Sequence, residues 1–174
     1  MRILIAEDEQ RTRQGLVRVL QSLRDEYEIV AQASNGKAAL EMILEQKPDV
    51  VFVEFSVNDD ANEFFMETYE SLIRKIYTFD QNTAIIIINC VRYDDGGSAE
   101  VWHAKVARYY ELPQISMQRS IYPEVAAGRI SAEEITADYL HPNDIGHKLV
   151  AGVIESFLEE VYTEREQKEA EAEE

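Results

Sequence analysis

The stretch Pro48–Asp60, which reads PDVVFVEFSVNDD, constrains the fold more than any other part of the chain. Within it, Val50–Val53 is short, apolar and rich in β-branched residues, which is typical of a strand buried on both faces. Charged and amide side chains begin abruptly at Glu54. In parallel α/β sheets, ligands bind outside the carboxyl ends of the strands. The stretch therefore predicts a buried parallel strand with chemistry-bearing residues at its end.

Strand-like and helix-like segments alternate along the rest of the chain. We expect strands at residues 2–6, 28–33, 48–55, 84–91 and 114–117, and helices at 11–23, from 36 onward, at 62–79, at 98–111 and at 142–162. This alternation requires right-handed crossovers. It predicts a single flavodoxin-like domain over residues 1–162, with a doubly wound five-stranded parallel sheet in the order 2-1-3-4-5 and three α/β/α layers. The ligand crevice is expected where strands one and three adjoin.

The charge of the chain excludes some partners. Its 34 Asp and Glu against 17 Lys and Arg give a net charge of -17, which argues against nucleic acid and anionic membrane surfaces. Residues 163–174 form an acidic tail, expected to be a solvated helix end. The sequence shows no signal peptide and no membrane-spanning run, which favours a cytoplasmic or recombinant setting. The single cysteine, Cys90, lies in an apolar run and is expected to be buried rather than nucleophilic.

Residues 1–53 resemble the first half of a response-regulator receiver domain. The matching segments are MRILIAEDE, QGL, ASNGKAALE and KPDVV. The resemblance implies that Glu7 and Asp8 stand at the acidic pair that binds Mg²⁺, and that Glu54 stands where the phosphoacceptor Asp belongs. A glutamate there mimics the charged state more often than it accepts phosphate. The family's later signature residues are absent, because its Thr or Ser is replaced by Asn89-Cys90 and its Lys-Pro by Leu112-Pro113.

Three carboxylates at one rim leave two interpretations open. Glu7, Asp8 and Glu54 could together hold Mg²⁺ or Ca²⁺ weakly, because these cations prefer oxygen ligands. Alternatively, they form a solvated acidic patch with no tightly bound ion. No other cofactor is expected.

Residues 49–162 resemble an SGNH (GDSL-type) hydrolase of the carbohydrate-esterase-like group, so residues 54–162 are expected to be the hydrolase-like part of the domain. Two blocks carry the resemblance: VFVEFSVND, and DYLHPNDIGH at residues 138–147. A serine that attacks an acyl carbon needs an imidazole to take its proton. The resemblance implies that His141 is this base, that Asp138 orients it, and that Asn58 stabilises the oxyanion, helped by a backbone N–H such as that of Gly36. The implied substrate is a small acyl ester or an acetylated sugar.

The hydrolase nucleophile is missing. The family carries its serine in a Gly-Asp-Ser motif after strand one, where this chain reads Glu7-Asp8-Glu9. Glu9 therefore stands at the nucleophile position, and no Gly-Asp-Ser occurs elsewhere. Ser34 and Ser56 lie near the same rim, but nothing in the sequence aligns either with His141.

Three hypotheses follow from these two resemblances. The first is an engineered chimera, joined at the third strand, that folds without efficient catalysis. The second is a weak esterase or carbohydrate deacetylase with a surrogate nucleophile or water. The third is a degenerate receiver that acts as a signalling or interaction domain.

Overall fold

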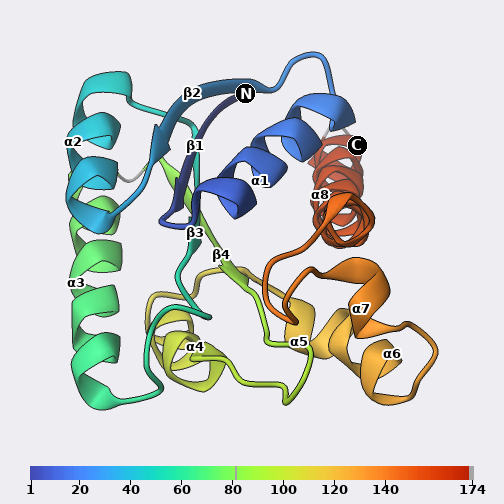
Figure 1. Ribbon diagram of the computed structural model, residues 1–174. Helices are drawn as coiled ribbons and strands as arrows, with labels where there is room; N and C mark the ends of the chain where they lie inside the picture. Colours follow the sequence, from blue (N-terminus) through green and yellow to red (C-terminus); the bar gives the residue numbers. More distant parts are fainter. Residues whose placement is uncertain (81, 173–174) are drawn as a thin grey trace.

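A computed structural model describes residues 1–80 and 82–172 of the chain (Figure 1). Its centre is a sheet of five strands in the order β2-β1-β3-β4-β5, and the strand pairs are all parallel. The strands are β1 (Arg2–Glu7), β2 (Glu28–Ala33), β3 (Val50–Glu54), β4 (Ala84–Asn89) and β5 (Gln114–Ser116). The predicted flavodoxin-like topology and strand order are confirmed.

In the described ranges of the chain, the five longer helices fall close to the predicted segments, and three short helices lie between β5 and the last of them. They are α1 (Gln10–Leu23), α2 (Gly36–Gln46), α3 (Glu63–Phe79), α4 (Glu100–Tyr109), α5 (Met117–Ser120), α6 (Tyr122–Ala126), α7 (Ala132–Ile135) and α8 (Asp144–Ala172). After residue 162 the chain continues as part of α8, up to Ala172. The sequence predicts a helix end for this acidic segment. Among the described helices, none is long and apolar enough to cross a membrane.

The helices cover both faces of the sheet (Figure 1). Alternate side chains of each strand point to opposite faces. Ile3 and Ile5 of β1 therefore join one core with residues of α1 and α8, including Leu20 and Ile154. The intervening strand residues, such as Leu4, join a second core with α2, α3 and α4. The strands are apolar on both sides because each side is buried.

The register of the sheet brings together residues of the predicted site. Glu7 at the end of β1 is paired with Glu54 at the end of β3. The three short helices α5 to α7 lie beyond this edge and lead the chain back to it (Figure 1). A bridge between Thr136 and Pro142 closes the turn that carries His141. The carboxyl ends of β1 and β3 thus meet the segment that precedes α8.

Candidate active site

Two carboxyl groups, those of Glu7 and Glu54, are buried side by side at the sheet edge. Each residue is 1% exposed. Oε2 of each lacks a partner among the described residues if both groups are ionised. Burial, followed by the charge of Glu54 and a hydrogen bond with it, raises the pKa of Glu7 well above its usual range. The raised pKa favours a protonated Glu7 at neutral pH, whose carboxyl O–H could donate to Glu54.

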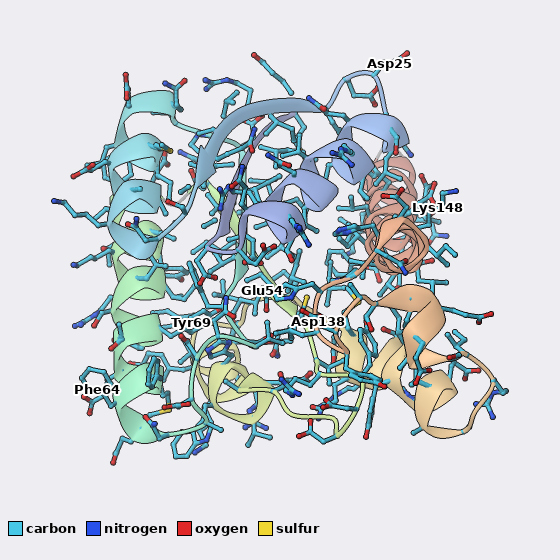
Figure 2. All side chains as sticks on the ribbon, in the orientation of Figure 1. Asp25, Glu54, Phe64, Tyr69, Asp138 and Lys148 are labelled. Carbon is cyan, nitrogen blue, oxygen red and sulfur yellow. The ribbon has the colours of Figure 1, made fainter. Side chains whose placement is uncertain are left out.

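Glu54 is surrounded by hydrogen-bond donors. Its Oε1 accepts from the backbone N of Ser56 at 2.8 Å, from Ser56 Oγ at 2.5 Å and from the backbone N of Cys90 at 3.3 Å. Figure 2 shows Glu54 near the centre of the molecule, between Tyr69 on the α3 side and Asp138 on the α7–α8 side. Three donors thus converge on one carboxylate oxygen of Glu54 and hold its side chain in place.

Neither Ser56 nor Cys90 is placed to act as a nucleophile. Ser56 is fully buried, and its hydroxyl lies between Glu54 and the carbonyl oxygen of Cys90, 3.0 Å away. Burial raises the pKa of the Cys90 thiol well above its usual value, and the charges of Glu54 and Glu7 add to this effect. A thiol held in its protonated form is a poor nucleophile.

Asp138 and His141 form a preassembled pair. Asp138 Oδ2 lies 2.6 Å from His141 Nδ1. Asp138 Oδ1 accepts from the backbone N–H groups of His141 at 2.8 Å and Leu140 at 3.1 Å. These bonds, the backbone bond from His141 first, lower the pKa of Asp138 to about 2. An ionised Asp138 stabilises the proton on Nδ1 and leaves Nε2 of a neutral His141 as a base.

The turn that holds this pair is a local structure. Tyr139 adopts a left-handed backbone conformation with φ 64°, which folds residues 138–141 back on themselves. Its backbone N donates to Thr136 Oγ1 at 3.0 Å, and its carbonyl accepts from the backbone N of Tyr93 at 2.7 Å. These tertiary contacts over-determine the strained residue and so fix the position of His141.

Glu9 occupies the predicted nucleophile position and caps α1. Its Oε2 accepts from the backbone N of Thr12 at 2.6 Å. Burial opposes ionisation of Glu9, but backbone donors from Thr12 and Arg11, together with the charge of His141, outweigh it and lower the pKa of Glu9. Glu9 is therefore an anion that faces the imidazole without offering a nucleophilic hydroxyl.

Five of the predicted site residues line one small cavity. Its lining includes Glu7, Glu9, Glu54, Asn58 and His141. The cavity offers about 10 Å³ to the centre of a water-sized sphere, which is about the minimum for one water molecule. The site as it stands therefore has room for a water but not for an acyl group.

The expected oxyanion donors are only partly in place. Asn58 lines the cavity, but its Nδ2 donates to Asp8 Oδ1 at 2.5 Å, so the amide is already engaged. Gly36 begins α2, and a Cβ atom added there would lie 3.4 Å from the side chain of Leu72 on α3. Gly36 is not part of the cavity lining. Its role as an oxyanion N–H therefore stays a prediction.

The predicted metal ligands are only partly brought together. Glu7 and Glu54 adjoin, whereas Asp8 turns to Asn58. In the part of the chain that the structure describes, no group of three or more His, Cys, Asp or Glu side chains is arranged to hold a metal ion. A weak Mg²⁺ or Ca²⁺ site formed by these three acids remains a prediction.

A second Asp–His pair, formed by Asp59 and His103, was not predicted from the sequence. His103 is 1% exposed, and its Nε2 lies 2.9 Å from Asp59 Oδ2. Its ring stacks on Tyr69 of α3, with centroids 3.8 Å apart and planes inclined by 7°. Asp59 follows Asn58 directly, so the contact between His103 and Asp59 anchors the loop that carries the side-chain amide of Asn58. The helical position of His103 gave no signal of this contact, because its partner lies 44 residues earlier.

Comparison with known proteins places the chain in a family. Residues 3–92, more than half of the chain, match the response regulator receiver domain. The chain therefore belongs to this family. The match runs past residue 53, where the sequence suggested that receiver likeness ends, and covers β1 to β4.

Curated relatives of the receiver part are bacterial regulators. The uncharacterized transcriptional regulatory protein YhcZ of Bacillus subtilis is 31% identical over 87 residues, which cover 50% of this chain and 37% of that protein. The transcriptional regulatory protein LnrK of the same organism is 39% identical over 54 residues, 31% of this chain and 24% of that protein. The chain thus spans well under half the length of these relatives.

Solved structures show the second likeness over nearly the whole chain. A two-domain esterase (CEX) active on acetylated mannans, co-crystallized with mannopentaose, superposes with a TM-score of 0.82 at 37% identity. The match covers 94% of this chain and 50% of that protein, so the chain spans half the length of the esterase. The acetyl xylan esterase AlAXEase shares the fold, with a TM-score of 0.66 at 19% identity over 90% of this chain. Both resemblances inferred from the sequence are therefore confirmed: the chain combines receiver and SGNH-esterase features in one sheet.

Proposed function

We propose that this chain is an engineered chimera whose receiver-type first half and acetyl-esterase-type second half share one sheet, and that it folds without efficient catalysis. One observation carries the proposal. His141 has the carboxylate partner that a general base needs, with its Nδ1 2.6 Å from Asp138 Oδ2, yet the residue at the nucleophile position beside it is Glu9 rather than a serine. A base without a nucleophile leaves only small contributions from binding and oxyanion stabilisation.

The joining of two families within one sheet supports a laboratory origin. The receiver match and the esterase likeness overlap on the same strands. Natural fusions add whole domains. A junction within β3 instead joins parts of two sheets, and it preserves the strand order and the right-handed crossovers only because both parent proteins have the same topology. Residues 1–53 would come from the receiver parent, residues 54–162 from the hydrolase parent, and residues 163–174 would be an acidic extension.

Weak hydrolysis by water is the second candidate function. The cavity beside His141 is about large enough for one water molecule, and a neutral imidazole could deprotonate it. The esterase with the higher likeness acts on acetylated mannans, so acetylated sugars are the substrates to test. A permanently charged receiver is less well supported, because Glu54 is buried and bonded to Ser56 and Cys90.

Restoring the nucleophile tests the proposal. The double substitution Glu7→Gly and Glu9→Ser recreates Gly-Asp-Ser around Asp8. Serine is a preferred N-cap, so it should keep the start of α1 in place of Glu9. Removing both carboxyl groups also enlarges the cavity. We expect this variant to hydrolyse 4-nitrophenyl acetate measurably, while the unmodified chain does so little or not at all.

Matched variants identify the source of any activity. Glu7→Gly with Glu9→Ala makes the same cavity without a hydroxyl and should stay inactive. In the restored variant, His141→Ala should abolish turnover, and Asn58→Ala should reduce kcat by up to about 10²-fold, as for loss of one oxyanion donor. Activity that survives His141→Ala would refute the assigned base. Strong activity in the unmodified chain would refute the proposal of a chimera without catalysis.

A further inference from the structure

A second, larger cleft opens between α1 and the start of α8. Its volume is about 320 Å³, and it is lined by Arg11, Gln14 and Arg18 on one side and by His141 and residues up to His147 on the other. His141 and Pro142 also line the small cavity, so the two spaces lie next to each other. A volume of this size is at the lower end of those that hold small ligands, roughly 300 Å³ and upward.

The spacing of the α1 residues explains why they share the cleft. Positions 11, 14 and 18 are separated by three and four residues, which places them on one face of a helix. Gly15 lies on the same face, where a Cβ atom would collide with the ring of His147. The glycine thus lets His147 pack directly on α1, and the longer side chains on either side of it form the wall of the cleft.

The two arginines of this wall have no acidic partner in the described part of the chain. Neither Arg11 nor Arg18 forms an ion pair there, although acidic residues outnumber basic ones by 34 to 17. Arg13, on another face of α1, donates instead to the backbone oxygens of Glu7 and Asp8. Among the cleft-lining residues, Asp144 is the carboxylate, so guanidinium groups dominate the wall.

We propose that this cleft binds a small molecule through a carboxylate or phosphate group held by Arg11 and Arg18. Guanidinium groups present several donors in a planar fork that matches such oxyanions. Gln14 adds an amide donor from the same face, and His147 faces the cleft from α8. Because His141 lies at its edge, the bound molecule would sit beside the Asp138–His141 pair. The inference does not depend on hydrolytic activity.

Titration of the whole chain at pH 7 tests the proposal. Backbone amide resonances are followed by NMR during additions of inorganic phosphate, with NaCl used to hold ionic strength constant. We expect saturable shifts concentrated in residues 11–18 and 141–147. A parallel titration with glucuronate, with glucose as its neutral counterpart, tells whether the site takes carboxylates as well as phosphate.

Substitutions assign the binding to the two arginines. Arg11→Gln and Arg18→Gln, singly and together, remove charge from exposed positions, so folding should persist. The double variant should bind the probe about tenfold more weakly or worse, as expected for lost charge-assisted hydrogen bonds. Arg108→Gln on α4, an exposed arginine on the helix layer that covers the opposite sheet face, is the matched control and should bind as the unmodified chain does. Shifts that do not saturate with either anion, or unchanged affinity in the double variant, would overturn the proposal.

Discussion

Replacing Glu7 with glutamine should stabilise the protein at neutral pH. Glu7 is 1% exposed, and its pKa is raised by burial and by Glu54. A carboxyl group that stays protonated in the folded state, but ionises at about 4.5 when unfolded, contributes its full stability only below that value. As the pH rises, ionisation of Glu7 lowers the free energy of the unfolded state, while the folded state keeps the proton and is not stabilised. The free energy of unfolding therefore falls with increasing pH.

The size of this loss of stability follows from the number of pH units between the unfolded-state pKa of Glu7, about 4.5, and the pH of the measurement. Each pH unit above the unfolded pKa costs about 1.4 kcal/mol, so the penalty at pH 7 is about 3 kcal/mol. Glutamine is always neutral and keeps the contacts of protonated Glu7. Its Oε1 can accept from the backbone N of Glu9, as Glu7 Oε1 does at 2.9 Å, and its Nε2 can donate to Glu54. The substitution should thus remove the penalty without opening a cavity.

Urea unfolding at several pH values between 5.5 and 8 measures the effect. The variant should be more stable than the unmodified chain, and the difference should grow by about 1.4 kcal/mol per pH unit. Glu41→Gln, an exposed substitution on α2, is the control and should change stability by less than about 0.5 kcal/mol at every pH. A difference that does not vary with pH, or a variant less stable at pH 8, would refute a protonated Glu7 in the folded state.

Further predictions concern ions, packing and the second histidine pair. If the three rim acids bind a divalent cation, millimolar MgCl₂ or CaCl₂ should raise the melting temperature more than NaCl at equal ionic strength, and equal effects would remove the idea. Gly15→Ala should cost about 1–3 kcal/mol in urea unfolding, because the new Cβ meets the ring of His147, and the cost should shrink when His147→Ala is added. His103→Ala should cost about 2–4 kcal/mol, because it removes a buried stacked ring and leaves Asp59 without its partner; a loss below about 0.5 kcal/mol would argue against an anchoring role. Amide hydrogen exchange should show α8 as less protected than the central strands, since its packing on α1 joins parts of two parents; the opposite ranking would contradict a weak join.

The sequence by itself determined the fold and which side chains meet at the edge formed by the ends of β1 and β3. Val50–Val53 and the other apolar runs alternate with helical stripes, and one sheet topology satisfies that alternation with right-handed crossovers. Polar residues directly after β1 and β3 had to meet, because the ends of neighbouring parallel strands share an edge. The spacing of Asp138 and His141 placed them within one turn of chain, so their contact is local and was predictable.

The tertiary structure alone decided what the rim residues can do. That Glu7 carries a proton depends on its burial against Glu54, which is 47 positions away in the sequence. That Asn58 is bound to Asp8, 50 residues earlier, and that Asp59 is held by His103, also depends on packing between distant elements. The cleft between Arg11, Arg18 and His147 exists only because α1 and α8 pack together. The protonation of a buried carboxyl group depends on how far the surrounding protein excludes water. The free hydrogen-bond donors and the shape of a cleft depend on contacts between segments far apart in the chain. Local sequence patterns carry no information about either.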